Sequence, residues 1–287
     1  RTDGTCYEAS ATGLLGDTGT EEGLHHVVWD MSAQGLELES SNLVFTVAYI
    51  PLPLYCVIDL STGANAANYS VSYLQDVPAG GWTDEYKTTK LVLRRIWPGT
   101  IPTRDAAITK SFYIGVFEVT QRQYELVMGT NPCSSSSYGK GNSYPVHLVS
   151  YSTIRGSSNG AKWPSSSTVE ATSFMGKIRK RTGISEFDLP TAAQWEYACR
   201  SGTATSFSYG DTEDGDYMWA VDNSGGQSHP VGMKNASAWG LYDIHGNVWE
   251  WCLDWAGGSL VGDDPIGASS GSKRVGRGGS WYYRASD

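Results

Sequence analysis

Two early segments of the chain alternate between apolar and polar or small residues, which is the pattern of a half-buried β-strand. The first is residues 43–49 (LVFTVAY), and the second candidate is residues 25–31 (HHVVWDM). Turn-forming Gly, Ser and Glu residues separate them. We therefore predict that residues 1–50 form a small β-sandwich-like module, which is stable only when it packs against another part of the protein.

Residues 51–89 lack a clear period and are rich in turn-forming residues. They contain STGANAANYS at 61–70 and PAGGW at 78–82, where Ser, Ala, Gly and Pro are concentrated. This composition predicts a connector between two domains. Regular structure resumes with KLVLRRI at 90–96, a predicted strand, and we expect residues 90–287 to form one mixed domain.

Two helices are predicted by capping boxes, in which a Thr and a Gln three residues later satisfy free backbone N–H groups at the helix start. Thr120 and Gln123 form the first capping box, ahead of the apolar residues Tyr124, Leu126 and Val127. Thr191 with Gln194 follows a proline and opens a helix over residues 192–200. Both helices belong to the mixed domain.

A third helix is predicted over residues 169–181, with Ser167 and Glu170 at its start and Gly183 at its end. We expect the second capping-box helix to stop at Gly202. Beyond that point Gly, Asp, Ser and Trp dominate and periodicity is lost. The last part of the chain should therefore consist of irregular loops with a few short strands, an arrangement typical of functional or ligand-supported regions.

The composition describes a folded, loop-rich protein with 34 Gly, 11 Trp and 17 Tyr. Aromatic residues in this number serve binding surfaces as well as cores. The net charge of −9 disfavours nucleic acid as a partner, because binding phosphates needs clustered Lys and Arg. The longest apolar run, residues 43–58, is broken by Pro51 and Pro53, so we expect no membrane insertion.

Several common catalytic patterns are missing from the sequence. The five Cys residues show no CxxC spacing and the five His residues no HxxH or HxxxH pair, which disfavours zinc ribbons and helix-borne transition-metal sites. No GxSxG motif occurs. The glycines of residues 276–279 lack the neighbouring residues of a phosphate-binding loop. Hydrolysis by a nucleophilic serine is therefore a poor expectation.

The densest group of aromatic and acidic residues is GLYDIHGNVWEWCLDW at 240–255. Alternation within it places Trp249, Trp251 and Trp255 on one face of a half-buried strand, with Cys252 and the acidic residues on the other. We predict that these tryptophans, together with Trp239, pack in the core.

Asp243 and Glu250 flank a Gly-Asn turn within the same segment. Their hard carboxylate oxygens, together with exposed backbone carbonyls, are ligands that suit calcium, whereas zinc prefers His or Cys. The alternative is that both acids are surface groups, or that Glu250 makes a cap or an ion pair inside the fold. Spacing alone leaves these alternatives open.

Four motifs follow one another in the order and spacing of a known family: YIG with EVT at 113–120, DLPTAAQWEYACRSGT at 188–203, WGLYDIHGNVWEWCLDW at 239–255 and RVGRGGSW at 274–281. From about Leu91 to its end, the chain resembles the formylglycine-generating enzyme (sulfatase-modifying factor) family. The resemblance implies an α+β, C-type lectin-like domain that is rich in irregular loops and supported by calcium. It also implies a calcium site formed by the side chains of Asp243 and Glu250 and the carbonyls of Gly246 and Val248.

The resemblance places Tyr283 where catalytic members carry the first of two reactive cysteines, and the second position lies beyond Asp287. A phenol cannot replace the soft thiolate that copper(I) needs. The resemblance therefore suggests a non-catalytic member, such as a variable protein of a diversity-generating retroelement, whose diversified segment begins at the GGSW motif. Cys199 and Cys252, which match cysteines in many members, are expected to be buried thiols or a structural pair.

The tail of the chain has the character of a binding loop, with rigid tyrosines and adaptable polar residues. We predict that the contact residues are Trp281, Tyr282, Tyr283, Arg284, Ser286 and Asp287. The predicted function is ligand binding or display, with a protein or glycan partner on another cell or host surface. The predicted location is secreted or at the cell surface, with a phage particle as the alternative. A formylglycine-generating or related oxidoreductase, a structural surface module and an ordinary terminal loop are the competing interpretations.

Overall fold

The computed structural model describes residues 14–16, 27–29 and 52–284, and the chain divides into the units Arg1–Ile50 and Pro51–Asp287. In the first unit, β1 (Leu14–Gly16) pairs antiparallel with β2 (Val27–Trp29). The strand predicted at residues 25–31 is thus present in its central part. The strand predicted at residues 43–49 lies outside the described residues, so the β module stays a prediction.

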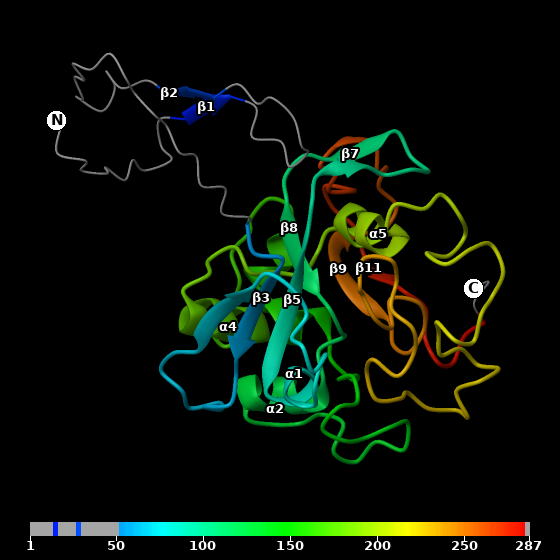
Figure 1. Cartoon of the computed structure of the whole chain (residues 1–287). Coiled ribbons are helices and arrows are strands. Elements are labelled where there is room, and N and C mark those ends of the chain that lie inside the picture. Colours follow the sequence, from blue (N-terminus) through cyan, green and yellow to red (C-terminus); the bar gives the residue numbers. More distant parts are fainter. Residues whose placement is uncertain (1–13, 17–26, 30–51, 285–287) are drawn as a thin grey trace. The chain divides into compact units, whose positions relative to one another are not determined.

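The second unit is built on a four-stranded antiparallel sheet with the order β4-β3-β5-β8 (Figure 1). Its strands are β3 (Tyr55–Asp59), β4 (Ser70–Leu74), β5 (Lys90–Ile96) and β8 (Phe112–Gly115). The strand predicted at residues 90–96 is confirmed with the predicted bounds. It lies between β3 and β8, inside the sheet.

The connector predicted over residues 51–89 is wrong for its described part. This segment contains β3, β4 and the short helix α1 (Glu85–Thr88), and β3 is paired with β5 along its whole length. The turn-rich stretches at 61–70 and 78–82 lie largely in loops between these elements rather than between domains. The strand escaped prediction because its residues are buried on both faces, which removes the alternation that reveals a half-exposed strand.

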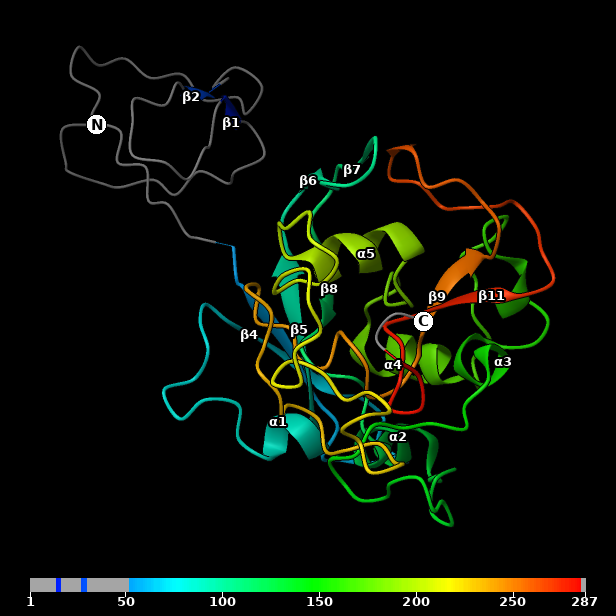
Figure 2. The same ribbon diagram turned by 90° about the vertical axis from the view of Figure 1, so that its right-hand side faces the viewer.

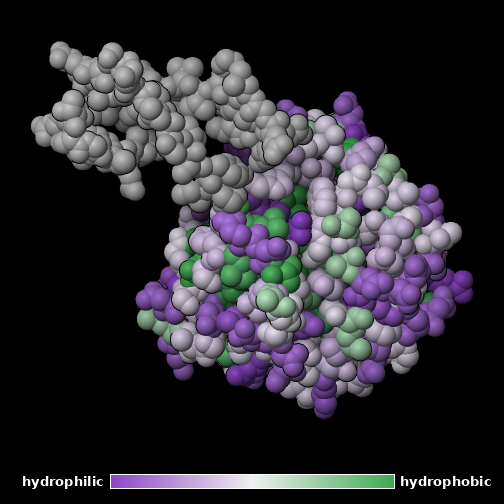
Figure 3. All heavy atoms as spheres, in the orientation of Figure 1, coloured by the Kyte–Doolittle hydropathy of each residue, from purple (hydrophilic) through white to green (hydrophobic). Residues whose placement is uncertain are grey.

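The two faces of the sheet are covered by different clusters of apolar side chains. Cys56, Ile58 and Leu93 face a cluster that includes Tyr124 and Phe174, which belong to two helices. On the opposite face, Tyr55, Val57 and Val92 pack with Tyr86, Val116, Phe117 and Val231. Figure 3 shows hydrophobic residues gathered in the area where Figure 1 shows β3 and β5, with polar residues over most of the remaining surface of that view.

The helices of the second unit are α2 (Gln121–Met128), α3 (Tyr151–Arg155), α4 (Phe174–Thr182) and α5 (Ala192–Arg200), with a 3₁₀ turn at Gly160–Lys162. Both predicted capping boxes are confirmed. Ser201, in the left-handed conformation, caps the end of α5, one residue before the expected stop at Gly202. No helix in the described part of the chain is long and apolar enough to cross a membrane.

Helix α4 starts at Phe174 and not at residue 169 as predicted, although it ends at Gly183 as expected. Its true N-cap is Ser173, whose hydroxyl accepts from the N–H of Gly176 at 3.1 Å. Glu170 cannot serve a capping box because its carboxylate accepts from the N–H of Ser158 at 2.6 Å. A tertiary contact thus competes with the local signal.

Replacing Thr191 by Ala is expected to destabilise the domain by about 1 kcal/mol, since Thr191 caps α5. The Thr191 hydroxyl accepts from the N–H of Gln194 at 3.1 Å, and Ala leaves that N–H without its partner. Urea unfolding of both proteins measures the difference. Thr212→Ala, at an exposed position, is the matched control with no expected change, and equal stability of the two variants would show that the box contributes nothing.

Two smaller sheets complete the second unit (Figure 2). One contains β6 (Gly99–Thr100), β7 (Ala106–Ile108) and β10 (Gly262–Asp263), and the other pairs β9 (Glu250–Trp255) with β11 (Arg274–Arg277). In the described part after Gly202, only β9, β10 and β11 are regular elements, so the predicted loop-rich character of this part is confirmed.

Strand β9 is correctly predicted, but its faces are not. Cys252, Leu253 and Asp254 are all buried, because α5 covers one side of the strand and the cluster around Tyr151 covers the other. Trp251 packs in the core as predicted. Trp249 was expected there too, yet it precedes the strand and is 45% exposed.

Candidate ligand-binding site

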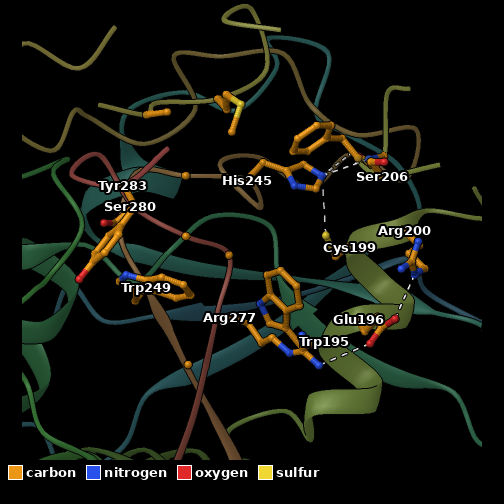
Figure 4. A pocket seen from close by; sticks show the side chains of 18 of the residues that line it. Trp195, Glu196, Cys199, Arg200, Ser206, His245, Trp249, Arg277, Ser280 and Tyr283 are labelled. Carbon is orange, nitrogen blue, oxygen red and sulfur yellow. Dashed lines mark hydrogen bonds and ion pairs between the residues drawn. The ribbon is translucent and has the colours of Figure 1, made fainter. Parts of the chain in front are cut away.

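A cavity of about 480 Å³ opens between α5, the loop after Asp243 and the C-terminal segment. Helix α5 contributes Trp195, Glu196, Cys199 and Arg200 to its wall, and Figure 4 shows these residues facing the cavity. Other lining residues come from three parts of the chain that are far apart in sequence: residues 206–220 in part, His245 to Trp249 in part, and Gly276 to Arg284 in part. The segment that the sequence predicted to bind ligand therefore borders a real cavity.

Glu196 lies at the base of one wall and meets three guanidinium groups. Its carboxylate is 2.9 Å from Nε of Arg104, 3.1 Å from Nε of Arg200 and 3.4 Å from Nη2 of Arg277. Burial by itself raises the pKa of Glu196, but hydrogen bonds and charge from Arg104, Arg200 and Arg277 hold it below the usual range. Glu196 is thus an ionised anchor that gathers arginines from three segments of the chain.

Cys199 and His245 form a neutral pair in the cavity wall. The Cys199 Sγ lies 3.7 Å from Nε2 of His245, which also accepts from the N–H of Ser208 at 3.1 Å. Burial raises the pKa of the Cys199 thiol well above its usual value. Burial, followed by the charge of Arg200, lowers the pKa of His245 to about 4. At neutral pH the pair is therefore a protonated thiol beside an uncharged imidazole. A protonated thiol is a poor nucleophile.

All four cysteines in the described part of the chain are buried thiols. Cys199 and Cys252 are buried and free, as are Cys56 and Cys133. Burial also raises the pKa of Cys252 strongly. Of the two interpretations made from the sequence for Cys199 and Cys252, buried thiols are confirmed and a pair is not formed.

A group of contacting aromatic rings, which we call the aromatic surface, consists of Tyr138, Trp249, Trp281, Tyr282 and Tyr283. Trp249 and Tyr283 of this group also line the cavity. Trp281 stacks on Tyr138 with ring centroids 5.3 Å apart, and Tyr283 meets Trp249 edge-on at 5.7 Å. Tyr282 contacts the rings on both sides of it. Tyr282 is 64% exposed and Tyr138 54% exposed, so these rings present apolar area to solvent.

The C-terminal segment is held by backbone atoms. The N–H of Trp281 donates to the carbonyl of Asn247 at 2.8 Å, and the N–H of Val221 donates to the carbonyl of Tyr283 at 3.0 Å. The hydroxyl of Ser224 donates to the carbonyl of Trp281 at 2.8 Å. These bonds do not use the side chains of residues 281–283, so changes of those side chains leave the bonding atoms in place.

The structure describes four of the six contact residues predicted from the sequence. Tyr282, Tyr283 and Arg284 are exposed and Trp281 is half-buried. Ser286 and Asp287 lie outside the described residues. Sequence reasoning missed Tyr138, which carries no local signal. It also missed Trp249, which the alternation at residues 249–255 assigned to the packed face of a strand.

Asp243 and Glu250, the predicted calcium ligands, are carboxylates within the fold. Asp243 is 2% exposed; Oδ2 accepts from the N–H of Gly232 at 2.6 Å, while Oδ1 finds no donor in the described part of the chain. Glu250 accepts from Nε1 of Trp195 at 3.1 Å. Burial raises the pKa of Asp243 to about 6, and burial together with Asp243 raises that of Glu250 to about 7. Neither acid is a surface group.

Glu118 is a third acid near this pair that sequence reasoning did not identify. Its carboxylate accepts from Nδ2 of Asn247 at 2.6 Å and from the N–H of Val248 at 2.9 Å. Burial raises its pKa, and the charges of Asp243 and Glu250 raise it further. Across residues 52–284, no three His, Cys, Asp or Glu side chains are arranged to hold a metal ion, so any calcium site here must rely on backbone carbonyls.

The turn between the two acids needs glycine at one position. Gly246 has a φ of +85°, and a Cβ on it would lie 2.2 Å from the carbonyl oxygen of Trp219. The backbone bond from the N–H of Asn247 to that carbonyl, at 2.9 Å, requires this close approach. The turn therefore has a fixed path that keeps Asp243 and Val248 near Glu118.

Comparison with known proteins identifies the family of the second unit. The model of the sulfatase-modifying factor enzyme 1-like domain matches residues 74–287. The chain belongs to this family. It is 31% identical to the chaperone protein LppX of Paenibacillus barcinonensis over 212 residues, which cover 62% of this chain and 72% of that protein. It is 35% identical over 111 residues to the formylglycine-generating enzyme of Streptomyces coelicolor, covering 32% of this chain and only 35% of that enzyme.

Among solved structures, Treponema denticola variable protein 1 is similar with a TM-score of 0.52 and 27% identity, over 69% of this chain and 86% of that protein. The expected fold, a mixed α and β domain of the formylglycine-generating, C-type lectin-like type, is confirmed. The match to a variable protein also fits a family member that serves as a scaffold. Relatives of this family thus include proteins named as enzymes, as a chaperone and as a variable protein.

Proposed function

We propose that this chain is a non-catalytic ligand-binding protein whose contacts come from the aromatic surface and the cavity beside it. The observation that carries this proposal is the exposure of Tyr282 and Tyr283 on a segment fixed by its backbone, with the exposed ring of Trp249 beside them. Such rings supply large contact areas at little cost in side-chain entropy. Trp249 and Tyr283 also line a cavity of about 480 Å³, and a concave site that combines aromatic side chains with polar groups is the usual form of a ligand site.

The cavity chemistry supports binding over cysteine oxidation. Tyr283 lines the cavity at the position where the resemblance to catalytic relatives predicts a reactive cysteine. Cys199 is the one cysteine among the lining residues, and its thiol is held protonated by burial. Copper(I) needs soft thiolate ligands, which a phenol and a protonated thiol do not supply.

We propose a protein or glycan on another cell or host surface as the ligand, and a secreted or surface-displayed location for this chain, with a phage particle as the alternative. The diversity-generating-retroelement type of function is supported by the similarity to the Treponema variable protein and by the backbone anchoring of residues 281–283. Nucleic acid is disfavoured by the net charge of −9.

Replacing Tyr283 by Ala is expected to weaken ligand binding by about 30-fold, the effect of losing one central aromatic contact. An array of surface proteins and glycans provides the ligand, and surface plasmon resonance then compares the variant with the unchanged chain. Tyr73→Ala is the control, because Tyr73 is 55% exposed on β4 and does not line the cavity. Binding that survives Tyr283→Ala and Trp249→Ala would remove the aromatic surface from the proposal.

The non-catalytic part of the proposal has a separate test. The purified chain is loaded with copper and incubated with a cysteine peptide of the sulfatase type in the presence of oxygen. We expect the thiol to stay unchanged, as measured by mass spectrometry. Conversion of the cysteine to an aldehyde would establish the competing oxidoreductase interpretation.

We also propose a structural calcium ion bound by the side chains of Asp243 and Glu250 and the carbonyls of Gly246 and Val248. The support is the buried Asp243 Oδ1 without a donor and the closeness of a second buried carboxylate, an arrangement that a hard divalent cation neutralises. Calcium accepts mixed carboxylate and carbonyl ligands at flexible geometry. The ion would hold the loop that carries Trp249 and the anchor of Trp281.

A further inference from the structure

Positively charged side chains outnumber negatively charged ones in the lining of the cavity. Arg104, Arg200, Arg277 and Arg284 line it, while Glu196 is the one acidic residue among the lining side chains. The chain as a whole carries a net charge of −9. A local excess of guanidinium groups in an acidic protein points to the chemistry of what the cavity receives.

Glu196 does not use up the donors of the arginines around it. Arg104 reaches both carboxylate oxygens through its Nε alone, at 2.9 Å. Arg277 approaches through Nη2 at 3.4 Å, which is a long and weak hydrogen bond. Each guanidinium carries several further N–H donors that can bind an acceptor.

Arg277 has a buried donor with no acceptor. Its Nε makes no hydrogen bond to any described residue, although this atom is shielded from solvent. A buried N–H of a charged group without a partner costs free energy, so the contact with Glu196 leaves the Arg277 guanidinium incompletely satisfied. The Arg277 side chain is 30% exposed and lines the cavity, so a ligand there can reach the exposed part of the guanidinium.

We propose that the cavity binds an oxyanion group of the ligand, a carboxylate or a phosphate or sulfate ester, through Arg277 with help from Arg104 and Arg200. This inference rests on the proposed binding function and names the chemical class that the site selects. A guanidinium matches an oxyanion by two parallel N–H donors. Trp249 and Tyr283 at the mouth then contact the uncharged part of the ligand.

These arginines lie outside the C-terminal segment, so selectivity for an oxyanion does not depend on the side chains of the aromatic surface. Arg104 follows β6, Arg200 ends α5 and Arg277 ends β11, and Glu196 fixes all three from the helix. None of them belongs to residues 281–287. The oxyanion contact would stay constant while the side chains of the aromatic surface set the remaining specificity.

The test titrates the full chain with three probes: N-acetylglutamate amide, inorganic phosphate and inorganic sulfate. Two-dimensional NMR follows the arginine Nε–Hε signals and the indole signals of Trp195 and Trp249. We expect a saturable shift of the Arg277 signal with at least one probe and none with N-acetylglutamine amide, which lacks the charge. The probe that binds most tightly shows whether the site prefers a carboxylate, a phosphate or a sulfate group.

Arg277→Gln is expected to weaken the best probe by about tenfold, since it removes the charge and the paired donors. Arg122→Gln is the matched control, because Arg122 pairs with Glu125 on the surface of α2 and does not line the cavity. If Arg277→Gln fails to fold, Arg104→Gln takes its place, since its side chain is 38% exposed. The proposal is overturned if no probe shifts the Arg277 signal, or if the variants bind the probe as the unchanged chain does.

This outcome is distinguishable from failure of the proposed function. A ligand from the array that is lost with Tyr283→Ala but insensitive to Arg277→Gln would keep the binding function and reject the oxyanion contact. Saturable probe binding at Arg277 with no ligand in the array would keep the anion site and reject the recognition function. The two proposals therefore stand or fall on separate measurements.

Discussion

Arg155→Met is expected to lower the free energy of unfolding by about 3–5 kcal/mol, the effect of removing one partner of a buried ion pair. The Arg155 side chain is fully buried, and its Nε and Nη2 donate to the two carboxylate oxygens of Asp188 at 2.7 and 2.8 Å. Its Nη1 donates to the hydroxyl of Tyr151 and to the carbonyl of Gly160. Methionine fills similar space, but it removes two charge-assisted hydrogen bonds from Asp188 and takes the Arg155 donor away from the Gly160 carbonyl and the Tyr151 hydroxyl.

Urea unfolding followed by tryptophan fluorescence measures this effect. Arg122→Met is the matched control: Arg122 pairs with Glu125 at 2.6 Å with both side chains more than a third exposed, and such pairs contribute about 0–1 kcal/mol. Arg179 also bonds Asp188 at 2.8 Å, and the N–H of Leu189 donates to the same carboxylate at 2.9 Å, so Asp188 keeps one charged and one backbone partner in the variant. A loss below about 1 kcal/mol would mean that Arg179 and water replace Arg155 fully.

Removing calcium with EDTA is expected to lower the melting temperature by about 5–10 °C when the protein was saturated beforehand. The reason is that ligand binding to the folded state alone stabilises it by mass action, by about 2.7 kcal/mol at a concentration 100 times the dissociation constant. Without the ion, Asp243 and Glu250 remain as close, buried carboxylates with one oxygen of Asp243 unsatisfied. Differential scanning calorimetry with and without the chelator measures the shift.

Asp243→Asn separates the ion from other effects of the chelator. The amide keeps the size of the side chain and an oxygen to accept from the N–H of Gly232, but it removes one charge needed for the ion. We expect its melting temperature to be insensitive to EDTA. Asp263→Asn, at an exposed position on β10, is expected to retain the full shift. An unchanged melting temperature of the native chain on chelation would reject the calcium proposal.

Local patterns predicted part of this fold with correct bounds. The apolar run at residues 90–96 became β5, and both Thr–Gln capping boxes opened the helices expected of them. The capping boxes were predictable because their hydrogen bonds join residues three positions apart. Strand β5 was predictable because its run of apolar residues is long enough to be recognised. The predicted start of α4 was wrong because a non-local contact intervenes: the carboxylate of Glu170 accepts from the N–H of Ser158, twelve residues earlier.

Features that depend on burial of both faces could not be predicted. Strand β3 was not predicted, because it is short, lies in a turn-rich segment and is buried on both faces, which removes the alternation of apolar and polar residues. Trp249 lies next to a strand of packed tryptophans, and only its place before β9 at the cavity mouth exposes it. Glu118 is far in sequence from Asp243 and Glu250, so its approach to them is a result of packing alone.

The sequence by itself determined the family, the strand β5, the capped helices and the aromatic character of the C-terminal segment, since each is written in residues that are neighbours along the chain. Only the tertiary structure decided that Arg104, Arg200 and Arg277 meet at Glu196, that Tyr138 joins the rings of the tail, and that residues 52–89 belong to the central sheet. The physical reason is that these contacts join residues many positions apart. Their energy comes from burial and charge pairing after the chain has packed, which no local pattern records.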